Sequence, residues 1–309
     1  LITEVIGQSY VLTNYTTRDG LAHNNIRDID IDSTGFLWLS TWDGVSRYDG
    51  IEFRNYFHSP GDSTTIPYFS IRQIVIDGKN NLWALADNGQ LCKFDRRNER
   101  FTTISRINDV NCSLISGLTD DRNGNLILLL RSGVLKFFPE EEKTILYIFD
   151  TKSSDILSSP GSFRYIDCDR ADRVWIIGDL IREVELRSRD EAGSESSVVV
   201  NQYNISSSAD SLRPSVDFSL NYRFFNDNKG KIWIASNAGL FHLDSSGKTF
   251  TDYKGRLEDI KFKTSMPLSF YRPDDGLSVF FPGSDTLITV AREICKIPVK
   301  SLATGRNQF

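Results

Sequence analysis

The sequence contains few of the residues that most often carry catalysis or hold metals. Its 309 residues include one Met, three His and four Cys, and the cysteines lack the C-x-x-C spacing of a zinc or thioredoxin-type site. The sequence also has no H-E-x-x-H motif, no glycine-rich phosphate loop, and no His in a recognisable Ser or Cys nucleophile motif. We therefore expect no enzymatic activity, no cofactor and no metal in this chain. The cysteines, which do not decide between an oxidising and a reducing compartment, are Cys92, Cys112, Cys168 and Cys295.

Long apolar stretches and a strong charge imbalance are also absent. The most apolar run, Leu126–Leu130, is far shorter than the roughly 20 residues that a membrane-spanning helix needs. The balance of 36 basic against 41 acidic residues, a net charge of −5, argues against a nucleic-acid binder, and the 12% aromatic content excludes a disordered chain. The chain starts at Leu1 rather than Met and shows no export signal, so we expect a mature or trimmed piece of a longer protein.

The sequence does contain an internal repeat anchored by tryptophan. Three tryptophans are each followed by a glycine six residues later, and a fourth copy of this pattern keeps the glycine but has Ile127 in the Trp place. One further copy is a residue shorter, and a last, degraded copy has Leu287 at the anchor. Spacings of 45, 44, 48, 58 and 54 residues between anchors are typical of a repeat architecture. The six anchors are Trp38, Trp83, Ile127, Trp175, Trp233 and Leu287.

Two further columns of residues recur with the anchors. An aspartate stands six residues before five of the six anchors, where its carboxylate can accept hydrogen bonds from backbone N–H groups of a turn. One Asp per repeat is too widely spaced to share an ion, so we interpret this column as turn caps rather than as a metal or acid–base site. It consists of Asp32, Asp77, Asp121, Asp169 and Asp227. A basic column, which we expect to be a solvated strand face, consists of Arg47, Lys93, Lys136, His242 and Lys296.

Each repeat predicts four short strands. In the first repeat, Ile26–Ile31 alternates apolar and polar residues, and the segment 36–41 reads as a buried strand. A period of 40 to 50 residues with four strands and a buried Trp on the second predicts an all-β fold, namely a β-propeller of four-stranded blades with six repeats visible. We predict a single propeller domain over residues 1–309. A strand at 10–16 is expected to complete the last blade and close the ring, which would remove open sheet edges.

The first repeat resembles a known family. Its segments D-G-L-A-H-N-N-I at 19–26, D-S-T-G-F-L-W-L-S-T at 32–41 and D-G-V-S-R-Y-D-G at 43–50 are similar to the two-component regulator propeller repeat. That repeat fills the periplasmic sensor regions of hybrid two-component systems in Bacteroides-type gut bacteria. The resemblance weakens in some later repeats and spans roughly residues 10 to 300. Propellers of that family usually have seven blades, so either this ring has six or the chain ends before a seventh begins.

The resemblance implies a function, partners and a location. In that family two propellers precede a β-sandwich domain, a membrane helix, a histidine kinase, a receiver and a DNA-binding module. This chain resembles the first propeller alone and has no kinase motif. The resemblance implies a periplasmic sensor that detects an oligosaccharide and signals to genes for glycan utilisation. The implied partners are that oligosaccharide, the second propeller and β-sandwich domain of the same receptor, and a second receptor copy in a homodimer. No nucleic acid is expected to bind this chain.

Candidate binding residues follow from propeller geometry. Loops that enter the innermost strands share one face with the turns between second and third strands, and ligands usually bind there. Arg with Trp and Tyr suits a sugar bearing carboxylate or sulfate, because Arg binds such groups bidentately and aromatic rings cover the apolar sugar face. Each Arg could instead pair with a neighbouring acid such as Asp28, Asp30 or Asp167. The candidates are Trp42, which we expect to be exposed, Arg27, Arg72, Arg131, Arg164, Tyr165, Tyr222 and Arg223.

Three functional hypotheses remain open at this stage. The first is a sensor module that binds a glycan fragment without catalysis. The second is a structural or protein-docking propeller whose neighbouring domain binds the ligand. The third is a glycan hydrolase or lyase, which would need paired carboxylates or a His/Tyr pair converging on the channel. The repeat columns distribute the acidic residues over separate blades instead.

Overall fold

The structure is a computed structural model that describes the N-terminal half of the chain almost continuously and the C-terminal half mainly as strands. Among the described residues, no helix has the length and hydrophobicity needed to cross a membrane. The described residues are 12–108, 110–121, 123–130, 133–149, 165–169, 173–177, 181–187, 197–206, 223–226, 231–236, 239–244, 247–252, 268–272, 276–281, 286–291 and 294–298.

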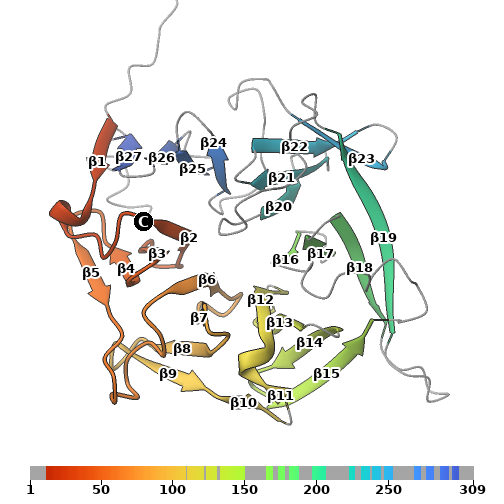
Figure 1. Cartoon of the computed structure of the whole chain (residues 1–309), viewed down its shortest axis with the longest axis horizontal. Coiled ribbons are helices and arrows are strands. Elements are labelled where there is room, and N and C mark those ends of the chain that lie inside the picture. The colour runs from red at the N-terminus through yellow and green to blue at the C-terminus, as the bar shows by residue number, and fades with distance from the viewer. Residues whose placement is uncertain are drawn as a thin grey trace, which may run out of the picture.

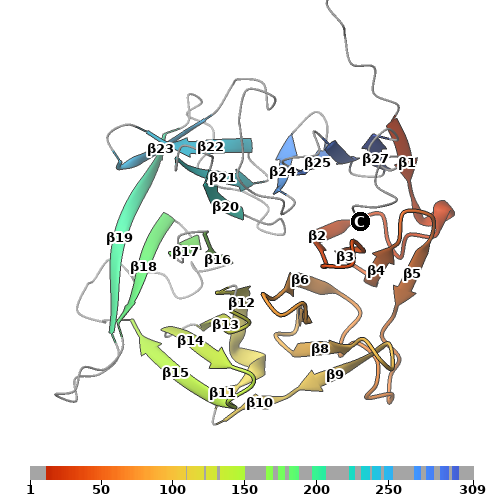
Figure 2. The same cartoon turned by 180° about the vertical axis from the view of Figure 1, so that it is seen from behind.

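The described strands form blades arranged in a ring, seen from its two sides in Figures 1 and 2. Two four-stranded antiparallel sheets form blades 1 and 2, a twelve-stranded sheet forms blades 3 to 5, and a five-stranded sheet forms blade 6. The predicted all-β propeller of four-stranded blades is therefore confirmed. Blades 1 and 2 consist of β2 (Ile26–Ile31), β3 (Leu37–Thr41), β4 (Gly44–Tyr48), β5 (Phe53–Tyr56), β6 (Ile71–Ile76), β7 (Leu82–Ala86), β8 (Leu91–Asp95) and β9 (Arg100–Ile104).

Blades 3 to 5 are joined through one long outer strand, β19 (Ser197–Ser206). It extends past its own blade and pairs in parallel with β15 at one end and β23 at the other. The remaining strands are β12 (Ile115–Asp120), β13 (Leu126–Leu130), β14 (Gly133–Phe138), β15 (Lys143–Ile148), β16 (Tyr165–Cys168), β17 (Val174–Ile177), β18 (Ile181–Arg187), β20 (Arg223–Asn226), β21 (Ile232–Ser236), β22 (Gly239–Leu243) and β23 (Thr249–Asp252). Between blades 2 and 3 lie the hairpin of β10 (Arg106–Ile107) and β11 (Val110–Asn111) and the 3-10 turn η2 (Cys112–Leu114).

Blade 6 contains strands from both ends of the described chain. The N-terminal strand β1 (Leu12–Tyr15) pairs antiparallel with β27 (Ile294–Pro298), with Tyr15 opposite Cys295. This pairing covers an edge of the sheet that would otherwise be open, and it links the two chain ends by backbone hydrogen bonds. The other strands of the blade are β24 (Leu268–Arg272), β25 (Gly276–Phe281) and β26 (Thr286–Ala291). The 3-10 turn η1 (Thr17–Asp19) follows β1.

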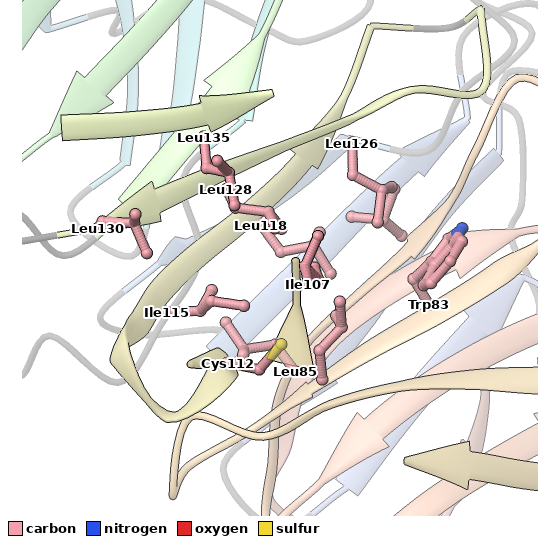
Figure 3. Close-up of a cluster of buried hydrophobic side chains, with 12 residues drawn as sticks. Trp83, Leu85, Ile107, Cys112, Ile115, Leu118, Leu126, Leu128, Leu130 and Leu135 are labelled. Carbon is pink, nitrogen blue, oxygen red and sulfur yellow. The ribbon is translucent and has the colours of Figure 1, made fainter. Parts of the chain in front are cut away.

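The anchor side chains form the core between neighbouring blades. Trp38 is fully buried, and its ring meets Phe94 of blade 2 edge-on at a centroid distance of 4.9 Å. Trp83 meets Phe137 of blade 3 in the same way at 6.4 Å. Figure 3 shows Trp83 in the cluster between blades 2 and 3, beside leucines of β12 and β13. Apolar burial is therefore distributed around the ring in several clusters, and four of those described contain an anchor.

Polar side chains of the innermost strands tie each blade to the next. Asp28 and Asp30 of β2 accept hydrogen bonds from backbone N–H groups of β6 at 3.0 and 2.8 Å, and Asp167 of β16 accepts one from β20 at 2.8 Å. Gln73 of β6 bonds both the N–H and the C=O of Leu118 on β12, each at 3.1 Å. Because adjacent inner strands share no backbone ladder here, these side chains satisfy buried backbone groups that would otherwise lack partners.

Candidate ligand-binding face

The turns between second and third strands meet the loops that enter the innermost strands. The backbone N–H of Trp42, after β3, donates to the carbonyl of Asn25 before β2 at 3.2 Å. The N–H of Asp87, after β7, donates to the carbonyl of Ser70 before β6 at 3.0 Å. The two kinds of loop therefore share one end of the blades, as predicted, and we call this end the candidate face.

Gly44 fixes the turn that carries Trp42. Its φ is +97°, and a Cβ there would lie 2.4 Å from the carbonyl oxygen of Tyr56. Its N–H donates to the carbonyl of Phe69 at 2.7 Å, which joins the turn of blade 1 to the loop entering blade 2. A side chain at this position would clash with the backbone, so the close contact requires glycine.

The column of residues eleven positions before the anchors coincides with a β-bulge in the first three blades. The register between first and second strands shifts at Arg27, at Arg72 and at Ser116, and each of these residues is the extra one on its strand. A bulge disrupts the alternation of a strand and re-aims a side chain. In blades 1 and 2 it directs an arginine toward the next blade.

Asp87 is the centre of the polar cluster on this face. One carboxylate oxygen forms an ion pair with Arg27 and accepts a hydrogen bond from the Ser70 hydroxyl at 2.6 Å. The other oxygen accepts from Nε of Arg72 at 3.1 Å, and Arg72 also donates to the carbonyls of Asp87 at 3.0 Å and Ser116 at 3.1 Å. Two guanidinium groups thus share one carboxylate, and the cluster links three blades.

The electrostatics of the cluster keep Asp87 ionised. Partial burial raises the pKa of Asp87, but the hydrogen bond from Ser70 and the charges and hydrogen bonds of Arg27 and Arg72 lower it more. The net pKa lies below the ordinary value of 3.8. With two positive groups and one negative, the Arg27–Asp87–Arg72 cluster carries a net charge of +1 at neutral pH.

Trp42 differs from the anchor tryptophans in its exposure. Its side chain is 47% exposed, and its ring stacks on His23 with centroids 6.2 Å apart. Phe57 and Phe69, which belong to the loop that contacts the same turn, are also about half exposed. The candidate face therefore presents aromatic surface as well as the arginine cluster.

The other predicted site residues are not part of this cluster in the described structure. Tyr165 is buried in the core between blades 4 and 5 rather than on the face. Arg223 belongs to β20, where its backbone pairs with Ala235. The remaining three candidates lie outside the described residues, and they are Arg131, Arg164 and Tyr222.

Arg27 and Arg72 both pair with an acid, as the structural alternative for these arginines expected, but the acid is Asp87 rather than one of those named in that alternative. The acids expected as partners, Asp28, Asp30 and Asp167, instead accept backbone hydrogen bonds from the next blade. The actual partner, Asp87, belongs to the second-to-third-strand turn of the neighbouring blade. The sequence predicts that turn but not how it lies against β2 of blade 1, so the pairing of Arg27 with Asp87 could not be predicted.

The aspartate column caps turns, as predicted, and three of its members also accept a hydrogen bond from the indole of their anchor. Asp77 accepts hydrogen bonds from the N–H groups of Lys79 and Asn81 at 2.9 and 2.8 Å. Its second oxygen accepts from Nε1 of Trp83 at 2.8 Å, a bond that the sequence analysis missed. The same indole bond links Asp32 to Trp38 at 2.9 Å and Asp169 to Trp175 at 3.2 Å. Among the described residues, no group of three or more His, Cys, Asp and Glu is placed to hold a metal ion.

The expectation for the basic column was wrong. Its described side chains are partly buried and lie over aromatic rings rather than in solvent. Nζ of Lys93 lies 4.9 Å from the ring centre of Trp83, and the guanidinium of Arg47 lies 5.7 Å from that of Trp38. The cause is the register, because in blades 1, 2, 3 and 5 the basic residue stands directly opposite the anchor on the neighbouring strand. Arg47 and Lys93 therefore cover their anchor rings through cation–π contacts, and Lys136 lies over Phe138 instead.

Comparison by sequence finds one short similarity. No family model matches the chain. A histidine kinase from Formosa agariphila is 40% identical over 58 residues, which make up 19% of this chain and 4% of that protein.

Comparison by structure finds β-propeller-like neighbours. The extracellular domain of a hybrid two-component system from B. thetaiotaomicron matches 94% of this chain with a TM-score of 0.62 at 15% identity. The extracellular domain of a one-component system from the same organism matches 94% with a TM-score of 0.60 at 17% identity. The chain spans 42% of the length of each of these two structures. These two structural neighbours are extracellular domains of Bacteroides signalling systems, the class that the repeat resembles.

Other functions occur on the same fold. An auxiliary nutrient binding protein from Bacteroides ovatus has a TM-score of 0.56 at 11% identity, and a streptogramin B lyase has a TM-score of 0.55 at 12% identity. Likeness at such identity shows the shared fold and leaves the function to the site.

Proposed function

We propose that this chain is a ligand-sensing propeller in the extracytoplasmic part of a two-component receptor. It binds an oligosaccharide at the candidate face, without catalysis, and the receptor regulates genes for glycan utilisation. The observation that carries the proposal is the exposed Trp42 ring at the same end of the blades as the Arg27–Asp87–Arg72 cluster. The similarity to extracellular domains of Bacteroides signalling systems supports the setting.

The chemistry of the face suits a sugar. The exposed indole of Trp42 offers a flat apolar surface for the C–H side of a pyranose ring, and the partly exposed Asp87 and Arg72 offer an acceptor and donors for its polar groups. The net charge of +1 on the arginine cluster favours a sugar that carries a carboxylate or sulfate. An acidic oligosaccharide is therefore the ligand that we propose.

The proposal extends to location and partners. The receptor would be inserted in the inner membrane with this propeller in the periplasm, next to a second propeller and a β-sandwich domain and within a homodimer. The length of the neighbouring structures, of which this chain matches 42%, is compatible with such a multidomain partner region.

Isothermal calorimetry with a panel of acidic and neutral oligosaccharides tests the proposal. We expect saturable binding of an acidic member, and we expect Trp42→Ala to lower its affinity about tenfold or more, as is typical of a truncated aromatic contact. Ile51→Ala is the matched control. Ile51 is also a large exposed hydrophobic residue, 84% exposed, but it belongs to the turn between β4 and β5 at the opposite end of the strands. That variant should bind like the wild type.

The outcomes separate the hypotheses. If no oligosaccharide binds this chain but a longer chain of the receptor binds one, the propeller is a scaffold for a neighbouring domain. That alternative is favoured by the observation that Arg27 is buried in its ion pair with Asp87. If binding occurs and Trp42→Ala leaves it unchanged, the candidate face is wrong. If chromatography shows a shortened or unsaturated product, the chain is an enzyme.

A further inference from the structure

The interface between blades 3 and 4 lacks the aromatic pair of the two preceding interfaces. At those interfaces an anchor tryptophan meets a phenylalanine from the third strand of the next blade. At the interface of blades 3 and 4 the anchor is Ile127. In blade 2, for example, Phe94 directly follows Lys93, the residue that pairs with the anchor Trp83 on the neighbouring strand. In blade 4 the anchor Trp175 pairs with Glu183, so the equivalent position is Val184. Both large aromatic side chains are thus replaced by smaller aliphatic ones.

A pocket of about 560 Å³ lies at this interface. Its walls include Ile127, Val184 and Leu186, together with charged residues from both blades. A volume of that size is within the range of roughly 300–1,000 Å³ that small-molecule sites occupy. The pocket is lined by the turn between β12 and β13, at the end of the blades opposite the turn of Trp42, so it is separate from the candidate face.

The pocket offers hydrogen-bond donors with unused capacity. Nζ of Lys136 lies 2.7 Å from Asp121, and no second hydrogen-bond partner of this ammonium exists among the described residues. Arg173 directs Nε and Nη2 at Asp169, at 2.9 and 2.7 Å, while its Nη1 has no acceptor in the described part of the chain. Asp121 already accepts four hydrogen bonds, from two backbone N–H groups, the amide of Asn125 and Lys136. Lys136 and Arg173 thus each keep an N–H donor that can meet a ligand.

The pocket also offers an open acceptor. Oε2 of Glu183 accepts from the hydroxyl of Tyr203 at 2.7 Å and from the amide of Asn201 at 3.2 Å. Oε1 of the same residue lies 3.9 Å from Nε of Arg173, too far for a hydrogen bond. Glu185, on the same strand, also lines the pocket. Positively charged donors and negatively charged acceptors thus line the pocket together with the aliphatic side chains of Ile127, Val184 and Leu186, which we call the aliphatic strip.

We propose that this pocket is a second binding site, which takes a zwitterionic amino acid with an apolar side chain. The carboxylate would meet Lys136 and Arg173, the ammonium would meet Glu183 and Glu185, and the side chain would lie on the aliphatic strip. An anion alone is disfavoured, because the charged lining residues comprise two positive and three negative groups. A neutral polyol is disfavoured, because it would desolvate these charges without returning a countercharge.

Calorimetry on the full chain with L-leucine as the probe tests this inference. We expect saturable binding of leucine. We also expect binding at least about tenfold weaker for isovalerate, which lacks the ammonium, for 3-methylbutylamine, which lacks the carboxylate, and for glucose. The absence of saturable leucine binding would overturn the proposal, as would glucose or either fragment binding as tightly as leucine.

Variants locate the binding. Ile127→Trp restores the anchor and fills the pocket, so it should abolish leucine binding, whereas Ile127→Val, which leaves the pocket open, should retain it. Glu183→Gln keeps an acceptor for Tyr203 but loses the charge, and it should weaken leucine binding about tenfold while isovalerate is affected less. Native circular dichroism and thermal unfolding verify that each variant folds. Wild-type affinity in both folded Ile127→Trp and folded Glu183→Gln would place the binding elsewhere and refute the site.

Discussion

The ammonium of Lys136 lies 2.7 Å from the carboxylate of Asp121, where the first, second and fourth repeats place an indole N–H. In the second repeat, for example, Nε1 of Trp83 donates to Asp77 at 2.8 Å. A buried carboxylate needs a donor, since desolvating an unpaired charge is unfavourable. Where the anchor became isoleucine, a residue of the basic column supplies that donor, and the turn is kept although the ring is lost.

The first prediction concerns the bond between the turn aspartate and the indole. Asp77→Ala removes the caps of the turn and leaves the N–H of Trp83 buried without its acceptor, so we expect a loss of about 2–4 kcal/mol in the free energy of unfolding. Urea denaturation followed by circular dichroism measures it. The control is Asp62→Ala, since exposed Asp62 also caps a turn, at Thr64, but bonds no indole, and a loss of about 1 kcal/mol or less is expected. Equal losses in the two variants would contradict the role of the indole bond.

The second prediction concerns pH. Burial raises the pKa of Asp32, Asp87 and Asp121, but hydrogen bonds and neighbouring cations lower it more, so each lies below the ordinary 3.8 in the folded chain. A carboxyl group with a lowered folded pKa stabilises the fold fully above its unfolded pKa, and that stabilisation is lost as pH falls through the folded pKa. Urea midpoints should therefore be flat between pH 7 and about 5 and fall steeply below about 4. In Asp87→Asn the fall should be shallower than in the wild type, and an unchanged slope would contradict the assignment.

The third prediction concerns ring closure. A chain that begins at residue 17 lacks β1 and exposes the edge of β27, so we expect it to melt roughly 5 °C or more below the full chain and to aggregate more readily. A chain that begins at residue 12 retains the four pairs between β1 and β27 and is the matched control. Differential scanning calorimetry compares the two. The same melting temperature for both would show that β1 contributes nothing to stability.

The fourth prediction concerns the thiols. Burial raises the pKa of the Cys112 thiol to about 11 and raises that of Cys92 as well, which keeps both protonated and unreactive at pH 8. In a Cys295→Ser background the three remaining thiols, all buried, should not react with Ellman's reagent in the native state. In guanidinium chloride all three should react. Rapid reaction of a native thiol would contradict the burial of that residue.

The fold could be predicted from the sequence because the same short pattern of residues recurs in most blades of the propeller. The anchor, the turn aspartate and the following glycine recur within about fifteen residues, and each blade is formed mainly by neighbouring segments. The burial of Trp38 and the exposure of Trp42 follow the same local reasoning, since the first lies within an apolar strand and the second begins a turn.

The partners of the charged residues could not be predicted in this way. Arg27 was assigned correctly to the mouth of an innermost strand, but its partner Asp87 is sixty residues away in the next blade. Lys93 was expected in solvent, yet the strand register places it over Trp83. Both errors concern contacts between segments whose relative positions depend on register and on blade packing, neither of which leaves a local signal.

The spacing of the anchors and the strand and turn pattern of each repeat already determined an all-β repeat fold, while the absence of long apolar runs, of cysteine and histidine motifs and of a charge bias argued against other classes of protein. These features are local, because each strand and turn depends on residues within one repeat. Only the tertiary structure decided which charges are paired, and that an isoleucine in the tryptophan place at residue 127 leaves a pocket between two blades. These features depend on how neighbouring blades pack, and packing is decided by the shapes and distances of side chains from distant segments.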